Sequence, residues 1–340
     1  MRVAMYYRNS DVRVEQFPVP AIGDDELLLK VMSSGICGSD VMEWYRVKSA
    51  PKVLGHEVAG IVEQVGRNVS RFAAGQRVFV THHVPCNTCR YCLAGKHTAC
   101  ETLHSTNFFP GGFAEYVRVP AINVDRGTFI LPQEMSFDEG VFIEPLGCTL
   151  RGQRAAGIMP GESVLVMGSG LAGLLHIALA KSLGARVIAS DINDYRLQAA
   201  KRYGADAVID ARGDVPALLR SHNEGRLADH VVLCTGALPA VEQSFRSVER
   251  GGTILIFAVP KPEDHVELPL NAFWRNQVRV VCSYAAAPRD LAEAIGLLRS
   301  GRISVREMIT HRLPLEKAQE GFLLTAEPKE SLKVVLAPHG

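Results

Sequence analysis

A chain of 340 residues in which 47% of the side chains are hydrophobic and 21% are charged has enough apolar material for two domains, each with its own core. The 37 basic and 36 acidic side chains leave a net charge of +1, so we expect a small-molecule partner and no strong attraction to nucleic acid or to an anionic membrane. The opening residues lack the apolar core of a secretory signal, and no apolar run approaches about twenty residues, which favours a cytoplasmic protein.

The first part of the chain is predicted to be an irregular, mostly antiparallel β domain. Short segments in which apolar and polar residues alternate are separated by Gly and Pro, a pattern typical of half-buried strands joined by turns. The expected strands include residues 27–32, 60–65, 77–80 and 114–119.

Cys37, His56 and Glu57 in this part of the chain offer a thiolate, an imidazole and a carboxylate. Zinc in catalytic sites accepts such a mixed set and keeps one position open. Taken singly, a Cys in a loop of small residues usually serves packing, and a single His is usually a core or surface residue. The three together predict a catalytic zinc site because they share a domain with a cysteine cluster.

That cluster places four of the eight cysteines within fifteen residues, at Cys86, Cys89, Cys92 and Cys100. Four thiolates satisfy zinc tetrahedrally, and two-residue gaps let neighbouring sulfurs converge on one ion. Because four sulfurs leave no position for water, the cluster predicts a structural zinc site. Two disulfides are one alternative, and a zinc finger for nucleic acid is another, although the segment carries little positive charge.

From about residue 146 the pattern becomes strand, glycine turn and helix, repeated. This alternation predicts a parallel sheet with helices on both faces. The expected strands are 163–168, 186–191, 207–210, 230–234 and 252–257, and the expected helices are 171–183 and 195–203. The last stretch, from about 276, is expected to return to the first domain.

A glycine-rich turn joins the first of these strands to its helix and has the pattern of a dinucleotide-binding motif. The first glycine permits the turn, the second lets the backbone approach a pyrophosphate, and the third lets helix and strand pack closely. The helix amides then face the phosphates. The residues predicted to bind the cofactor here are Gly168, Gly170, Leu171, Ala172 and Gly173.

Asp191 ends the next predicted strand, where a carboxylate can accept hydrogen bonds from the adenosine ribose. The same charge would repel a 2′-phosphate, so the sequence favours NAD over NADP. Arg196 lies close enough in sequence to soften that preference, and a solvated helix arginine is the alternative interpretation.

These motifs in this order resemble the zinc-dependent medium-chain dehydrogenases over essentially the whole chain. Glu144 in the Glu-Pro-Leu segment, and Ser39 where other members carry Thr, resemble the sorbitol and polyol dehydrogenase branch more than the ethanol branch, which has a cysteine at the position of Glu144. The resemblance implies a GroES-like catalytic domain formed by 1–145 and completed by 276–340, and a Rossmann domain formed by 146–275. It further implies NAD, two zinc ions per subunit, an active site in the cleft between the domains, and a homodimer or homotetramer.

The resemblance also assigns roles to residues. Cys37 and His56 become ligands of the catalytic zinc, and the third protein ligand is either Glu57 or Glu144. Asp40 would orient the His56 ring. Ser39 would be the first proton acceptor, hydrogen-bonded to the substrate oxygen.

Three positions outside the glycine motif are expected near the cofactor. Thr235 and Val259 follow later strands and are expected to line the nicotinamide side, although residues at strand ends also pack for structural reasons. Lys333 matches a basic position that contacts the pyrophosphate in relatives.

The chain departs from the polyol pattern in the region that reads the substrate. Met42 stands where many relatives carry a histidine in the proton exit, and Arg151 replaces another common histidine. Beside the metal loop, Glu43, Trp44 and Arg46 could bind a polar or charged substrate, or form a surface loop of mixed charge.

We therefore expect an NAD-dependent dehydrogenase that converts a polyol, cyclitol or sugar acid to a ketone. An L-threonine or amino-alcohol dehydrogenase and a non-catalytic zinc and nucleotide-binding relative are the alternatives.

Overall fold

The computed structural model describes residues 1–339, and the chain divides into two compact units. One unit comprises Met1–Gly147 and Ala285–Gly340, and the other comprises Cys148–Tyr284. Residues 276–284 therefore lie in the second unit, whereas the sequence pattern and the family resemblance predict them in the first domain. The reason is a short strand, Arg279–Cys282, whose four residues pair with the parallel sheet of the second unit.

The first unit is built on a seven-stranded sheet and a small three-stranded sheet. The large sheet has the order β15-β16-β3-β5-β6-β8, with β7 also paired to β3, and all its pairs are antiparallel except β15 with β16. The small sheet has the order β2-β1-β4. The strands are β1 Arg2–Arg8, β2 Asp11–Gln16, β3 Leu27–Ile36, β4 Lys52–Val53, β5 Glu57–Val65, β6 Arg77–Thr81, β7 Tyr116–Val119, β8 Thr128–Ile130, β15 Ile309–Pro314 and β16 Lys333–Ala337.

Short helices fill the connections between these strands. The longer helices lie at 143–156 and in the C-terminal stretch. The sequence pattern predicted no helix in either place. The α-helices are α1 Glu43–Arg46, α2 Arg90–Leu93, α3 Glu101–Ser105, α4 Ala121–Gly127, α5 Phe137–Gly140, α6 Ile143–Ala156, α12 Pro288–Arg299 and α13 Ala318–Ala326, and α6 continues into the second unit.

The C-terminal strand completes the core of the first unit. β16 pairs antiparallel with β3, so that Val335 lies opposite Gly35. All five residues of β16 are buried, which is the pattern of a strand covered on both faces. Leu27, Val58, Val334 and Phe322 are fully or almost fully buried members of one apolar core that spans both parts of the unit.

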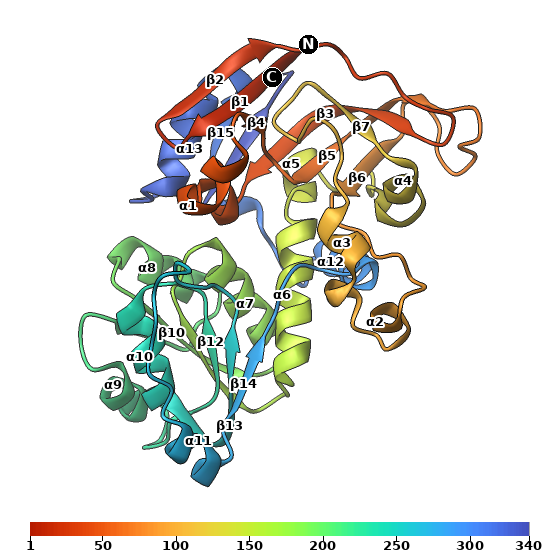
Figure 1. Ribbon diagram of the computed structural model, residues 1–340. Coiled ribbons are helices and arrows are strands. Elements are labelled where there is room, and N and C mark those ends of the chain that lie inside the picture. Colours follow the sequence, from red (N-terminus) through yellow and green to blue (C-terminus); the bar gives the residue numbers. More distant parts are fainter. Residues whose placement is uncertain (340) are drawn as a thin grey trace. The chain divides into compact units, whose positions relative to one another are not determined.

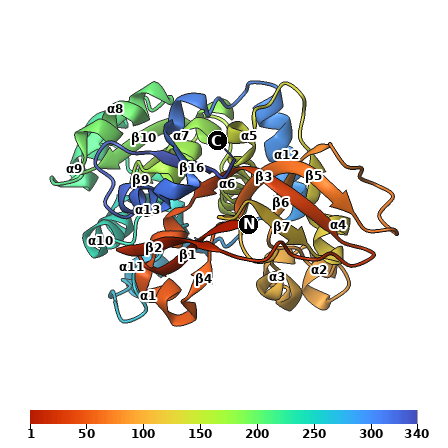
Figure 2. The same cartoon turned by 90° about the horizontal axis from the view of Figure 1, so that it is seen from above.

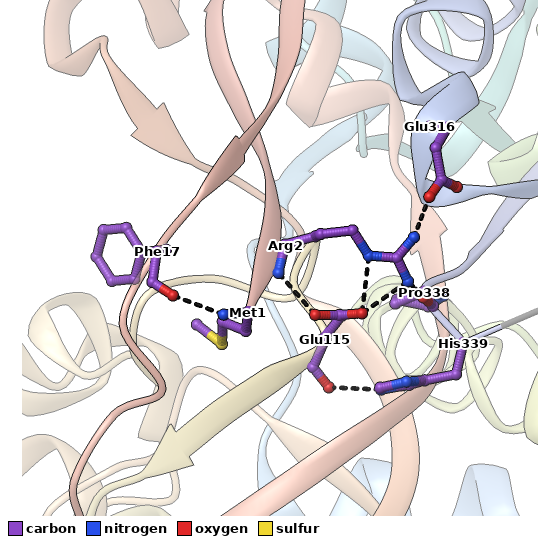
Figure 3. A network of polar contacts seen from close by, with 7 residues as sticks. All are labelled: Met1, Arg2, Phe17, Glu115, Glu316, Pro338 and His339. Atoms are coloured by element: carbon purple, nitrogen blue, oxygen red, sulfur yellow. Dashed lines mark hydrogen bonds and ion pairs between the residues drawn. The ribbon is translucent and has the colours of Figure 1, made fainter.

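An ion-paired network ties the first strand to the end of the chain (Figure 3). The Arg2 guanidinium donates to the Glu115 carboxylate at 2.6 and 2.8 Å and to the Pro338 carbonyl at 2.9 Å, and it also pairs with Glu316. The His339 ring lies 3.0 Å from the Glu115 carbonyl oxygen. The contacts of Pro338 and His339 join segments more than 200 residues apart in sequence within the same unit.

The second unit is a six-stranded parallel sheet with the order β11-β10-β9-β12-β13-β14. Counted along the chain from β9, this is the 3-2-1-4-5-6 order of a Rossmann fold, and it confirms the predicted doubly wound sheet. The strands are β9 Ser163–Met167, β10 Arg186–Asp191, β11 Ala207–Asp210, β12 Ala228–Leu233, β13 Val248–Ile256 and β14 Arg279–Cys282.

The helices that connect the parallel strands pack against one another in pairs (Figure 1). α7 packs beside α8 and contacts β9 and β10, whereas α10 packs beside α9 and contacts β12 and β13. The helices are α7 Leu171–Ser182, α8 Asp194–Arg202, α9 Val215–His222, α10 Leu238–Ser247 and α11 Leu270–Asn276. Among residues 1–339, no helix combines the length and apolar character that crossing a bilayer requires.

Candidate active site and metal centres

Three predicted zinc ligands meet in the first unit because two paired strands bring them together. Cys37 directly follows β3, whereas His56 precedes β5 and Glu57 begins it. Gly35 lies opposite Glu57 in the antiparallel register of these strands. One ligand atom from each of Cys37, His56 and Glu57 lies within 4.8 Å of the others, a spacing that one metal ion can bridge.

Two glycines make room for this group. A Cβ atom at Gly35 would collide with the Glu57 carboxylate and with the Lys333 side chain. Gly55 has a φ of 93°, in the left-handed region that glycine tolerates best, and a Cβ there would collide with Phe113. The backbone turn at Gly55 therefore positions His56 in the site.

Asp40 lies beside the His56 ring. Its carboxylate is fully buried, accepts a hydrogen bond from the Cys37 backbone N–H at 3.0 Å, and lies 3.4 Å from His56 Nδ1. Burial opposes ionisation of Asp40, but the His56 and Arg46 charges outweigh it and lower the pKa of Asp40. Burial likewise opposes protonation of His56, while the Asp40 carboxylate and the Cys37 thiol raise the pKa of His56 well above its usual value. With Nδ1 facing Asp40, Nε2 is the nitrogen left for a metal.

Ser39 lies in the turn between Cys37 and Asp40 and is held by Arg46. Arg46 Nε donates to the Ser39 backbone oxygen at 2.8 Å, and Arg46 Nη2 donates to Ser39 Oγ at 3.2 Å. The same Nη2 lies 3.5 Å from Asp40 Oδ1. Arg46 thus belongs to the site rather than to a separate surface loop, a point that the sequence left open.

Glu57 forms a fully buried ion pair with Lys333. The Lys333 ammonium binds Glu57 Oε2 and also donates to the Ile36 carbonyl at 3.2 Å. Glu57 Oε1 is buried and has no hydrogen-bond partner among the described residues. Lys333, expected at the pyrophosphate, therefore lies in the core of the first unit. A lysine inside the apolar segment 332–336 was the sequence signal for a buried charge pair.

Glu144 lies outside the group of three. It occupies the first turn of α6, is 7% exposed, and belongs to the first unit. Among residues 1–339, the group that could hold one ion with Cys37 and His56 contains Glu57 and not Glu144.

His82 is a further neighbour of the site. Its ring centroid lies 4.8 Å from that of His56 and 3.7 Å from that of His83. Burial, together with nearby positive charge, lowers the pKa of His82 well below its usual value and that of His83 to about 4. Both imidazoles are therefore neutral at pH 7.

The four cysteines of the second cluster converge around the short helices α2 and α3, which lie side by side in Figure 2. The four sulfur atoms all lie within 4.8 Å of one another. The closest pairs, Cys89 with Cys92 and Cys86 with Cys100, are 3.6 Å apart. A disulfide needs about 2.05 Å, and all eight cysteines are free. Hydrogen bonds from Thr88 and Cys89 lower the pKa of Cys86 to about 5, whereas burial raises that of Cys92 to about 12.

The glycine-rich turn of the second unit has the shape that a pyrophosphate requires. Gly168 has a φ of 91°, and a Cβ at Gly173 would collide with the Gly168 carbonyl oxygen. A Cβ at Gly170 would meet nothing closer than the Arg196 guanidinium carbon at 3.9 Å. The backbone at Gly170 is thus open where α7 begins, with Leu171 and Ala172 in its first turn.

Asp191 lies beside this turn, at the end of β10. Its carboxylate accepts hydrogen bonds from the Ser169 and Asn193 backbone N–H groups at 2.7 and 2.9 Å. Arg196 Nη1 lies 3.8 Å from the same carboxylate. The carboxylate is therefore fixed in place at the position expected to meet the ribose.

Two more predicted cofactor residues lie near the turn. The Cβ position at Gly168 is 3.2 Å from Thr235 Cβ, which places the ends of β9 and β12 together. This pair of strands is the point at which the strand order reverses, where open parallel sheets bind ligands. The backbone of Val259 closely approaches Gly236, next to Thr235.

The residues present fit the groups that the sequence predicts. The uncoordinated Glu57 Oε1 beside Cys37 and His56 suits a metal with mixed ligands, and four convergent sulfurs suit zinc. The open backbone at Gly170 next to a fixed carboxylate suits a dinucleotide.

Comparison with known proteins finds dehydrogenase families over both parts of the chain. Residues 23–126 match the alcohol dehydrogenase GroES-like domain, and residues 172–300 match the zinc-binding dehydrogenase model. Sorbitol dehydrogenase from Mus musculus is 35% identical over 341 residues, covering 96% of this chain and 92% of that protein. A putative zinc-binding dehydrogenase from Sinorhizobium meliloti, solved with NADP, aligns with a TM-score of 0.88 at 30% identity and covers 99% of each chain. Galactitol-1-phosphate dehydrogenase from Escherichia coli aligns with a TM-score of 0.86 at 28% identity, covering 99% of this chain and 100% of that one.

Proposed function

Because the chain belongs to the zinc-dependent medium-chain dehydrogenases, in the branch of the sorbitol dehydrogenases, we propose an active site built on Cys37, His56 and Ser39. The protein is a zinc-dependent oxidoreductase of the alcohol dehydrogenase type that oxidises a polyol with NAD as the hydride acceptor. The observation that carries the site assignment is the convergence of Cys37, His56 and Glu57 beside Ser39.

The proposed catalytic zinc is held by Cys37, His56 and Glu57. The free Oε1 of Glu57 supports Glu57 over Glu144 as the third ligand, because a buried oxygen without a hydrogen-bond partner is costly unless something binds it. Bound there, zinc would polarise the substrate oxygen as a Lewis acid. Cys86, Cys89, Cys92 and Cys100 are proposed to hold the structural zinc.

Ser39 is proposed to accept the first proton from the substrate hydroxyl. Its Oγ already accepts one hydrogen bond from Arg46 Nη2, which leaves one lone pair for the incoming proton and one O–H to pass a proton on. Arg46 cannot itself accept a proton, since a guanidinium stays charged at any working pH. Asp40 fixes the His56 ring throughout.

The second unit is proposed to bind NAD through the turn from Gly168 to Gly173. Asp191 would accept hydrogen bonds from the adenosine ribose, with Arg196 beside it. Thr235 and Val259 are proposed to line the nicotinamide side. The location of Lys333 at Glu57 supports a role in fixing the metal ligand and gives no support to a direct contact with the cofactor.

We propose a homodimer or homotetramer in the cytoplasm. β14 is an edge strand of the parallel sheet, and the nearby Leu270, Trp274 and Val280 are exposed apolar side chains. An unpaired edge with apolar neighbours is a surface on which a second copy can pair. Four thiols that serve as zinc ligands must stay reduced, which supports the cytoplasm.

The test is NADH formation by zinc-loaded protein on sorbitol, xylitol, myo-inositol, gluconate and L-threonine, with NAD binding measured separately. We expect turnover on one stereochemical family of polyols, reduced about 10²–10⁴-fold in Ser39→Ala because proton transfer loses its acceptor. Exclusive turnover of L-threonine would replace the polyol assignment. Intact NAD binding with no turnover of any compound would contradict the assignment as a dehydrogenase of this class.

A further inference from the structure

Arg46 is a charged side chain in direct contact with the Ser39 hydroxyl, and its position is fixed. It ends α1 and reaches back to Ser39 through two hydrogen bonds, to the backbone oxygen and to Oγ. Its side chain is 18% exposed, so it is accessible to a small molecule but is held on one side by the protein. A guanidinium in this state loses little conformational freedom when it binds a ligand.

The two carboxylates of the site, Asp40 and Glu57, neutralise the charge of Arg46 only in part. Asp40 lies 3.5 Å from Arg46, at the outer limit of a hydrogen bond, and it also serves the Cys37 N–H and the His56 ring. Glu57 is paired with Lys333 out of contact with solvent. Arg46 therefore retains capacity for a further anion.

Glu43 is a further carboxylate near Arg46, one turn before it in α1. Its Oε1 accepts a hydrogen bond from the Asn9 backbone N–H at 2.9 Å. The hydrogen bonds that Arg46 makes within residues 1–339 come from Nε and Nη2. The two N–H groups of Nη1 are therefore left as donors for a ligand.

We propose that Arg46 binds an anionic group of the substrate, so that the preferred substrate is a polyol bearing a carboxylate or a phosphate. This inference rests on the proposed function, in which Ser39 contacts the reacting hydroxyl. Two successive hydrogen bonds then separate that hydroxyl from the guanidinium, a reach of about 6 Å. A carboxylate or phosphate a few carbons from the oxidised carbon fits this reach and can bind a guanidinium with two parallel hydrogen bonds.

The test compares matched neutral and anionic substrates on zinc-loaded protein. Sorbitol is paired with gluconate and with sorbitol 6-phosphate, and xylitol is paired with xylonate, which separates carboxylate from phosphate as the preferred anion. We expect the wild-type protein to favour an anionic member by about tenfold or more in kcat/KM, and we expect the advantage to shrink at high salt. Equal or better turnover of the neutral members would overturn the inference while leaving the polyol dehydrogenase assignment intact.

Arg46→Met and Arg46→Lys locate the effect. Arg46→Met should remove the preference for the anion by about ten- to a hundredfold, chiefly through KM, and Arg46→Lys should retain part of it. Arg299→Met, which changes an exposed arginine outside the site, is the matched control. An equal fall of neutral and anionic turnover in Arg46→Met would show that Arg46 only positions Ser39, and would overturn the inference.

Calorimetric titration of gluconate and sorbitol into the NAD-bound protein supplies a readout that does not depend on turnover. Tighter binding of gluconate in the wild-type protein, lost in Arg46→Met, is the expected result. The same affinity for gluconate in both proteins would overturn the inference. Absence of turnover on every neutral and anionic compound would count against the proposed function itself, which distinguishes the two failures.

Discussion

The metal-binding group of the first unit and the nucleotide-binding turn of the second position their functional atoms by different means. In the first unit, charged side chains fix several of the functional groups, as in Asp40 with His56 and Glu57 with Lys333. In the second unit, shape comes from the backbone, through Gly168, Gly170 and Gly173, and the Asp191–Arg196 pair adds charge beside it. Substitutions in the first unit should therefore act through charge, and those in the second through steric fit.

Removal of a metal ligand should have the largest effect. We expect Cys37→Ser to lower kcat/KM by about a thousandfold or more, since several kcal/mol of stabilisation of the developing charge would be lost. Thermal unfolding should change little by comparison. Cys282→Ser, at an exposed cysteine outside both metal sites, is the matched control and should keep near-normal kinetics.

Removal of one partner of the buried ion pair should have the next largest effect. Lys333→Met leaves the Glu57 carboxylate buried without its counter-charge, and we expect a loss of about 3–5 kcal/mol in the free energy of unfolding. Adding Glu57→Gln should recover much of that loss. Lys317→Met, at an exposed pair with Glu320, should change stability by less than about 1 kcal/mol. A similar loss of unfolding free energy in Lys333→Met and Lys317→Met, measured by denaturant unfolding, would contradict the view that charge pairs fix the functional side chains of the first unit.

A methyl group in the nucleotide-binding turn tests the steric half of the comparison. Gly173→Ala brings a Cβ against the Gly168 carbonyl oxygen, so the free energy of unfolding should fall by about 1–3 kcal/mol and NAD should bind more weakly. Gly296→Ala, in α12 with no atom within 4 Å of the new Cβ, should be neutral or stabilising. Unchanged NAD affinity in Gly173→Ala would contradict the assigned role of the turn.

A histidine of the second unit should give a smaller effect that depends on pH. His176 is fully buried, and this burial lowers its pKa to about 3 from a usual value near 6.5. Between those values the unfolded chain binds a proton that the folded protein does not. Stability should therefore fall as the pH drops from about 6.5 toward 3, by at most about 1.4 kcal/mol per pH unit.

His176→Gln should flatten that slope, and unfolding measured across this range of pH is the check. An identical slope in His176→Gln and the wild-type protein would show that His176 does not titrate as described. The contrast with His56 is instructive, because at His56 the Asp40 carboxylate outweighs burial and raises the pKa, whereas at His176 burial lowers the pKa.

Sequence patterns predicted the parallel sheet well because its strands are continuous apolar runs between glycine turns. β10 and β11 begin and end where the sequence indicated. β14 was missed, since four residues on an exposed edge carry little periodic signal. Its omission moved the expected boundary to 275, whereas the second unit extends to Tyr284.

Residue types and spacing predicted the two metal-binding groups, but not the contacts that hold them. The pairing of Glu57 with Lys333 joins positions 276 residues apart, and it depends on β16 lying beside β3. The hydrogen bond from Arg46 to Ser39 depends on the short turn between η1, Gly38–Val41, and α1, a geometry that sequence periodicity does not encode. The first contact thus depends on tertiary strand pairing, and the second depends on local turn geometry.

The measurement that most directly tests the account is the number of zinc ions per chain, together with NADH formation on a polyol, in the wild-type protein, Cys37→Ser and Cys100→Ser. The account predicts two zinc ions in the wild-type protein and one in each variant. Cys37→Ser should be folded and inactive, and Cys100→Ser should be destabilised. Two zinc ions and wild-type turnover in Cys37→Ser would contradict the assignment of the reaction to the Cys37, His56 and Glu57 group.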